Sequence, residues 1–196
     1  MLDLRDVDDP RALRALAHPV RLALLEVLTV HGPQTATEAG GRIGESATTC
    51  SFHLRQLAKY RFVEEAGGGQ GRSRPWRMTT IGMRFANPPD DPDDPEAEDA
   101  SHALVQLRHD RQLGRLRAWH ETQGDHPPRW RRAAPSGNYL FWLTVEELEQ
   151  LSADLEALLL DRFTDRLTDP SKRPPGAAPV ELVVYGYPVE RPEGGD

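Results

Sequence analysis

Two helix-start signals lying close together constrain the fold of this chain more than any other feature of its sequence. Thr35 and Glu38 have the spacing of a capping box, in which each side chain caps the backbone of the other residue. Ser46, eleven positions after Thr35, is a second N-cap and precedes apolar residues at helical spacing. These signals predict a short helix over 36–41, a tight turn, and a longer helix over 47–60.

Two further helices are expected before this pair. Asp9-Pro10 is typical of a helix start, because aspartate caps the first turn and proline fits the first helical position. A residue that precedes proline disfavours the helical conformation, so His18-Pro19 should separate the first helix from a second one over 19–30. The first 60 residues therefore predict four helices.

The third and fourth helices have the pattern of a helix-turn-helix. In such a pair the second helix enters the major groove of DNA, which is about 12 Å wide, with its first turns facing the base edges. Here the apolar stripe of that helix is formed by Cys50, Leu54 and Leu57. The residues expected to face DNA lie opposite this stripe, and they are Thr48, Thr49, Ser51, Phe52 and Arg55.

A glycine-rich hairpin follows the predicted recognition helix. Residues 62–65 and 72–79 have strand character and enclose a loop with four glycines. The loop lacks the Gly-Lys-Ser/Thr sequence of a nucleotide-phosphate loop, and no helix follows it. The hairpin is therefore expected to be a wing, with Arg72, Arg74 and Arg77 contacting phosphates or the minor groove.

Charge is distributed unevenly along the chain. The 196 residues carry a net charge of −7, which taken alone argues against a nucleic-acid binder. Residues 10–85, however, carry 11 basic and 5 acidic side chains, a net of +6, whereas residues 87–100 carry 7 acidic and no basic ones. We therefore expect a DNA-binding domain over 1–86, an acidic, proline-rich linker over 87–100, and a second region over 101–196.

A long helix over 96–123 is expected to begin the second region. His102, His109 and His120 fall on one apolar stripe of this helix, together with valine and leucine residues. Successive histidines are about 10 and 16 Å apart along the axis, so no two of them can share a metal ion without ligands from elsewhere. The stripe indicates ordinary packing, a pH switch at a dimer interface, or a metal site between subunits.

A second capping box, Thr144 and Glu147, begins another helix. Its leucines have heptad spacing and pack either within the subunit or across a dimer, and we expect dimerisation. Residues 138–143 and 180–185 have strand character, and the aromatic residues near them form either an ordinary core or a ligand pocket. The expected dimerisation residues are Leu148, Leu151, Leu155 and Leu158.

The segments ALAHPVRL and SFHLRQL, within residues 10–80, resemble the ArsR/SmtB group of bacterial winged-helix transcriptional regulators. The resemblance implies a homodimer on an inverted-repeat operator in double-stranded DNA, with Ser51 and His53 on the DNA face. Metal-sensing members carry cysteines where this chain has TATEAGGRI, so that metal site is not expected. Arg61 replaces the family's usual helix-ending glycine, which would cost about 1 kcal/mol if the backbone there is left-handed.

We therefore expect a mainly helical α+β chain, a winged helix-turn-helix followed by a small dimerisation or effector region. The predicted function is a cytoplasmic, dimeric DNA-binding repressor, neither an enzyme nor a membrane protein, without cofactor or metal. Cys50 is expected to be a core residue, and the competing hypothesis for it is a redox-sensing thiol.

Two other functions fit the same sequence pattern. The first is a winged-helix module that binds a protein in place of DNA. The second is a regulator that responds to metal or pH through the three histidines on the long helix. A response of the repressor to an unidentified small-molecule effector also stays open.

Overall fold

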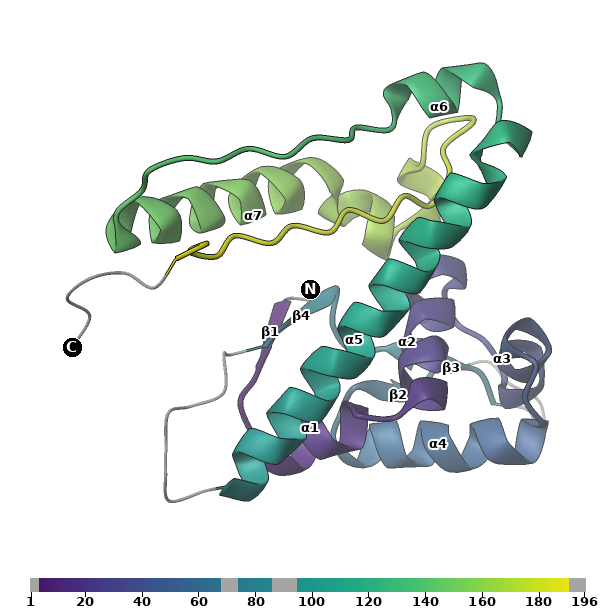
Figure 1. Ribbon diagram of the computed structural model, residues 1–196. Helices are drawn as coiled ribbons and strands as arrows, with labels where there is room; N and C mark the ends of the chain where they lie inside the picture. The colour runs from purple at the N-terminus through teal and green to yellow at the C-terminus, as the bar shows by residue number, and fades with distance from the viewer. Residues whose placement is uncertain (1–3, 68–73, 86–94, 191–196) are drawn as a thin grey trace. The chain divides into compact units, whose positions relative to one another are not determined.

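A computed structural model describes residues 4–67, 74–85 and 95–190 of the chain (Figure 1). The chain divides into two compact units, Met1–Arg115 and Leu116–Asp196. Arg72, most of the glycine-rich loop and the first part of the expected acidic linker lie outside the described residues.

The N-terminal unit is a helical domain with two small sheets. Its four expected helices and its hairpin are confirmed, whereas the parallel pairing of the first and last strands was not predicted. The second and third strands pair in antiparallel fashion as the hairpin. In chain order the elements are β1 (Leu4–Val7), α1 (Pro10–Leu16), α2 (Pro19–His31), α3 (Ala36–Ile43), α4 (Ala47–Lys59), β2 (Val63–Glu65), β3 (Trp76–Met78), β4 (Gly82–Phe85) and the first part of α5 (Pro95–Thr122).

The helix starts form as the sequence predicts. The Asp9 side chain caps α1 by accepting a hydrogen bond from the backbone N–H of Arg11 at 2.9 Å. The capping box at α3 is complete, with Thr35 and Glu38 each accepting from the other's backbone N–H. Ser46 begins α4 by accepting from a backbone N–H of its first turn at 3.0 Å. These caps fix where α1, α3 and α4 begin.

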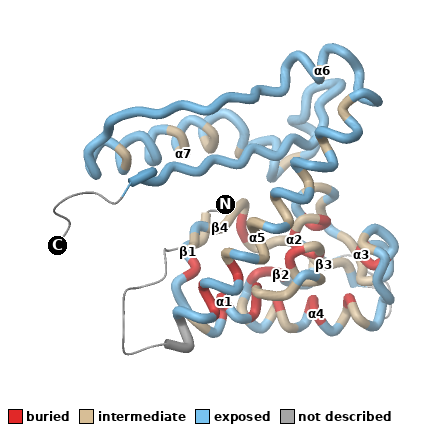
Figure 2. The backbone as a smooth tube through the Cα atoms, in the orientation of Figure 1, coloured by how far each residue is buried: buried red, intermediate tan, exposed pale blue. Residues whose placement is uncertain are grey.

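The core of the N-terminal unit lies between α1, α2, α4 and the start of α5 (Figure 2). Its largest fully buried side chains include Phe62, Leu16, Leu24, Leu54 and Leu57. Cys50, which we expected in the core, is also fully buried. The buried stripe of α4 therefore holds the helix against the rest of the domain.

The expected inward stripe of α5 is wrong. Two of its three histidines are exposed and His109 is half-buried, whereas Ala100 and Leu104 are buried against the N-terminal core. Glu26 of α2 also holds α5, by ion pairs with Arg111 and Arg115. The apolar residues of α5 are scattered around the helix, so periodicity alone did not identify the face that packs. Within the described residues no cluster of metal-ligating side chains is found.

The C-terminal unit contains the end of α5, η1 (Gln123–Asp125), α6 (Pro128–Ala133), α7 (Val145–Thr168) and η2 (Pro170–Lys172). The capping box at the start of α7 is confirmed. The strands expected over 138–143 and 180–185 are wrong for the single chain, because both segments have extended backbone without strand pairing. No helix in the described part of the chain is long and apolar enough to span a membrane.

The turn between α3 and α4 depends on a glycine. A Cβ atom at Gly40 would lie 2.5 Å from the backbone oxygen of Glu45 and 3.3 Å from Sγ of Cys50. The Glu45 N–H donates to the Gly40 carbonyl at 3.0 Å, and Gly44 ends α3 with φ of 75°. Only a residue without a side chain fits at Gly40, and this contact brings the two helices together.

Replacing Gly40 by alanine should lower the free energy of unfolding by about 1–3 kcal/mol, because the added methyl group overpacks the turn. Gly41 provides the matched control, since a Cβ there meets nothing within 4 Å. Gly41→Ala should be neutral or stabilise by up to about 1 kcal/mol through helix propensity. Urea unfolding followed by circular dichroism measures both, and equal effects of the two substitutions would contradict the role of Gly40.

Arg61 has the left-handed backbone that is typical of a helix-ending glycine, with φ of 58°. Arg61→Gly should therefore raise the free energy of unfolding by about 1 kcal/mol. Arg61→Ala removes the same exposed side chain but keeps the Cβ, so it should bring no such gain. A gain of equal size in the alanine variant would mean that the side chain, and not the backbone, is unfavourable.

Candidate nucleic-acid interface

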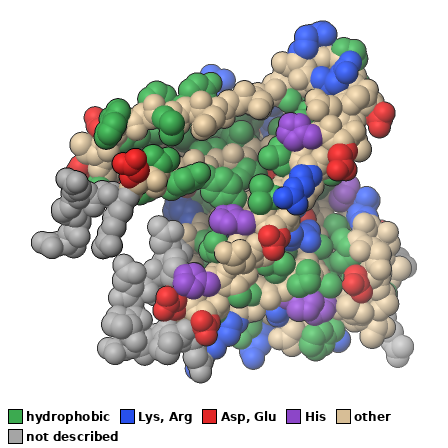
Figure 3. Space-filling view, viewed as in Figure 1, with side chains coloured by type: hydrophobic (Ala, Val, Ile, Leu, Met, Phe, Trp, Pro, Cys, Tyr) green, Lys and Arg blue, Asp and Glu red, His purple; other side chains and the backbone are tan. Residues whose placement is uncertain are grey.

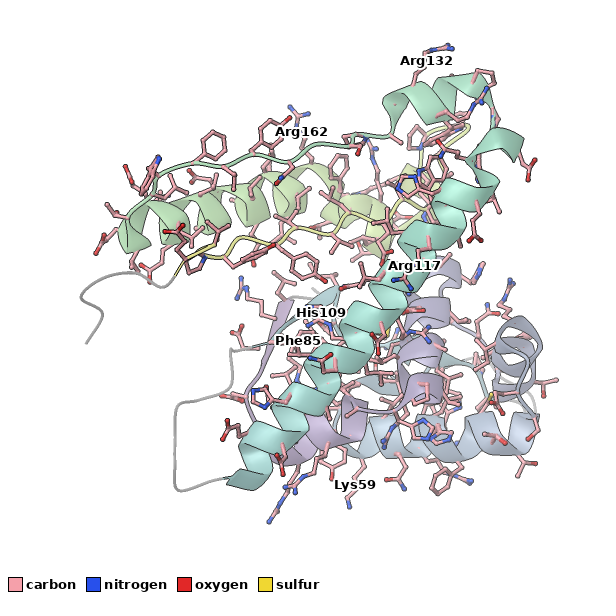
Figure 4. The ribbon with its side chains drawn as sticks, viewed as in Figure 1. Lys59, Phe85, His109, Arg117, Arg132 and Arg162 are labelled. Carbon is pink, nitrogen blue, oxygen red and sulfur yellow. The ribbon has the colours of Figure 1, made fainter. Side chains whose placement is uncertain are left out.

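α4 presents a buried face to the domain and a polar face to solvent. Phe52 is 53% exposed, and Thr49 and Ser51 are half-buried at the sides of this face. Lys59, which sequence reasoning missed, extends the exposed face by one turn and points away from the domain (Figure 4). The exposed part of the face consists of Thr48, Phe52, Arg55 and Lys59.

His53 does not lie on this exposed face. It is 9% exposed, and its ring lies 4.4 Å from that of His18 and 5.1 Å, edge to face, from that of Phe52. Its Nδ1 is buried and has no hydrogen-bond partner among the described residues. His53 therefore connects the start of α2 to the underside of the exposed face of α4.

The surroundings of His18 and His53 favour the neutral form of both rings. Burial lowers the pKa of His18, and the charge of Arg21 lowers it further, against the opposing charge of Glu45. Burial also lowers the pKa of His53, with His18 and Arg21 adding to the effect and Glu45 opposing it. Nδ1 of His18 accepts a hydrogen bond from the Val20 N–H at 3.2 Å, which a doubly protonated imidazole cannot do.

Acidification should therefore destabilise the domain. The histidine pKa values are lower in the folded chain, so below the unfolded value of about 6.5 the unfolded chain binds more protons, and the free energy of unfolding falls as pH falls further. Urea unfolding between pH 7.5 and 5.5 measures this dependence. His53→Gln should reduce the slope, and an unchanged slope in this variant would exclude His53 as a source of the pH dependence.

The hairpin is anchored next to the helix-turn-helix. Trp76 of β3 and Gln34, which precedes α3, exchange backbone hydrogen bonds of 2.7 and 3.0 Å. Arg77 pairs with Glu64 and Arg74 pairs with Glu65, each with an N–O distance of 2.8 Å. Because exposed ion pairs are weak, a phosphate can replace either carboxylate.

Sequence reasoning missed a group of arginines beside α4. Arg11 and Arg14 of α1 and Arg21 of α2 line a hollow of about 260 Å³, together with Gln56 of α4, Tyr60 directly after it and one alanine. None of the residues lining it is acidic, and Nε of Arg21 is buried without a hydrogen-bond partner in the part of the chain that the structure describes. The signal in the sequence was the spacing of Arg11 and Arg14, which places both on one face of a helix.

Cys50 lies on the opposite side of α4 from the exposed face. Burial raises the pKa of its thiol, and the charge of Glu45 raises it further. A raised thiol pKa opposes the formation of the reactive thiolate. This environment favours the core interpretation of Cys50 over the redox one.

A comparison with protein families finds a match within the N-terminal unit. Residues 16–66 match a family model described as a helix-turn-helix domain. A comparison with curated protein sequences finds no match.

Two solved structures are similar to larger parts of the chain. One, a transcriptional regulator from Thermotoga maritima, has 11% identity and a TM-score of 0.29, with 72% of this chain and 77% of that chain covered. The other, described as a transcriptional regulator, has 20% identity and a TM-score of 0.28, with 79% of this chain and 86% of that chain covered. TM-scores this low do not establish a shared fold.

Proposed function

We propose that this protein is a DNA-binding transcriptional regulator in which α4 is the recognition helix. The observation that carries the proposal is the face of α4 that is exposed, polar and basic, within a domain that matches the helix-turn-helix family. A helix of this kind, fixed by a buried stripe on its other side, fits the major groove.

In this proposal the exposed face of α4 reads the bases. Arg55 is suited to bidentate contact with guanine, and the exposed ring of Phe52 is suited to contact with a thymine methyl group. Thr48, Thr49 and Ser51 supply hydroxyl groups along the same helix. His53 acts from beneath this face, by supporting the ring of Phe52.

Two groups of arginines are proposed to hold the phosphates on either side of the groove. The wing supplies Arg72, Arg74 and Arg77, and the hollow beside α4 supplies Arg11, Arg14 and Arg21. Phosphate contacts position a protein on the duplex without specifying sequence. The recognition helix therefore has to provide the specificity.

We further propose an ArsR-like bacterial repressor that acts as a cytoplasmic homodimer on an inverted repeat. The leucines of α7 support the dimer: Leu148 and Leu155 are half-buried, and Leu151 and Leu158 are 41% and 51% exposed. α3 has no cysteine or histidine, so we propose no metal site of the ArsR/SmtB kind in this helix. No cofactor and no catalytic role are proposed.

The central test is binding to fragments of genomic DNA, including the region upstream of the protein's own coding sequence, in a mobility-shift assay. Arg55→Ala should weaken specific binding by about 1–3 kcal/mol, the usual value of one bidentate base contact. Arg84→Ala is the matched control, because Arg84 lies on the β1–β4 sheet and pairs with Asp6. If no fragment gives a salt-sensitive shift, a protein-binding role for the winged helix replaces this proposal.

The wing can be tested separately through the salt dependence of affinity. Arg74→Ala and Arg77→Ala should each reduce the slope of log K against log salt by about 0.9, the value of one phosphate contact. Glu64→Gln and Glu65→Gln are the matched variants, and they should strengthen binding because they release the same arginines. Fluorescence anisotropy measures both, and unchanged slopes in the alanine variants would remove the wing from the interface.

A further inference from the structure

The C-terminal unit has no core of its own in the single chain. None of the described residues between Leu116 and Glu190 is buried, and hydrophobic side chains gather on the surface of this unit (Figures 2 and 3). Trp142 is fully exposed and Tyr139 is 77% exposed. A folded unit offsets its conformational entropy by burying apolar surface, so this unit is incomplete as a single copy.

Two extended segments account for much of the exposed apolar surface. Residues 138–143 and 180–185 are rich in the aromatic and β-branched side chains that favour strands. The rings of Tyr139 and Phe141 are stacked 6.1 Å apart, so alternate residues point to the same side, as they do in a strand. Neither 138–143 nor 182–184 forms a backbone hydrogen bond with another described residue.

The helix α7 connects the two segments and reverses the chain between them, so both segments run in the same direction (Figure 1). Gly186, at the end of the second segment, lies against Leu148 of α7, since a Cβ there would be 3.2 Å from Cδ1 of that leucine. A strand, a helix and a parallel strand in this order form a βαβ unit when the strands belong to one sheet. Here the two segments do not pair with each other as strands. Each can therefore become part of a sheet only by pairing with the backbone of another chain.

We propose that residues 138–143 and 180–185 pair with the same segments of a second copy of this chain, forming an intersubunit β-sheet that packs on α7. Extended backbone without strand pairing, as at 138–143 and 182–184, is a template for strand addition where its apolar side chains are exposed. The sheet would cover the leucines of α7 and supply the core that the single chain lacks. This inference rests on the proposed homodimer and does not depend on DNA binding.

The charges of this unit favour a second copy of the chain as the partner that covers its apolar surface. Residues 145–157, the first half of α7, carry five acidic side chains and no basic one. Residues 158–173 carry four basic and three acidic side chains, and α6 adds three arginines. A Cβ at Gly176, just beyond η2, would lie 4.0 Å from Nη2 of Arg129 of α6, so these basic residues share one end of the unit. A two-fold axis across α7 places each acidic end opposite the partner's basic end.

Sedimentation equilibrium together with hydrogen exchange of the full chain tests this inference without DNA. The amides of 138–143 and 182–184 should be protected in the dimer, and they should lose that protection in parallel with dissociation on dilution. A dimer in which these amides exchange freely would overturn the sheet but leave the homodimer standing. A chain that stays monomeric at all concentrations would overturn both the sheet and the homodimer. The DNA-binding proposal is tested separately, by the mobility-shift assay.

A pair of substitutions at Val183 separates backbone pairing from side-chain packing. Val183→Pro removes a backbone donor in the middle of the segment and should weaken the dimer by about tenfold or more. Val183→Thr keeps the N–H and the β-branched shape, so it should weaken the dimer much less. Unchanged exchange protection of α2 and α4 would show that the proline variant keeps its N-terminal fold. Equal weakening by both substitutions would overturn the intersubunit sheet.

Discussion

The close approach of α3 to α4 at Gly40 is the contact on which the proposed DNA-reading surface depends. Because no Cβ separates Gly40 from Glu45, the turn is tight enough for Ser46 to begin α4 directly against α3. The stripe of α4 that starts at Cys50 is then buried, and the opposite face has to point outward. The position of this face therefore follows from one turn and one buried stripe.

The parts of the fold that could be predicted from the sequence are those fixed by nearby residues. Caps such as Thr35 and Ser46 act within one helical turn, so the helix starts were predictable. The pairing of Leu4 with Gly82 was not, because no local signal marks a contact between such distant residues. The contact between the rings of His53 and His18 was not predicted either, since the place of His53 on α4 did not reveal which residue packs against it.

The C-terminal unit also shows that a local preference for strand does not by itself produce a strand. The side chains of 138–143 and 180–185 favour strands, yet strands form only where another backbone supplies hydrogen bonds. Leu151 and Leu158 of α7 are likewise at helical spacing but largely uncovered. A second copy would supply the missing strand partner and cover these leucines. It would also present two recognition helices to an inverted repeat. The acidic surroundings of the basic domain would then weaken non-specific binding and leave selection of the site to α4.

Guanine N7 methylation protection on a bound genomic fragment tests most directly whether α4 reads the major groove. N7 lies in that groove, so its protection reports contact there and not on the phosphates. For a dimer we predict two protected clusters separated by about one helical turn, both lost in Arg55→Ala. A fragment that is bound by the chain without protection of any guanine N7 would contradict α4 as a recognition helix.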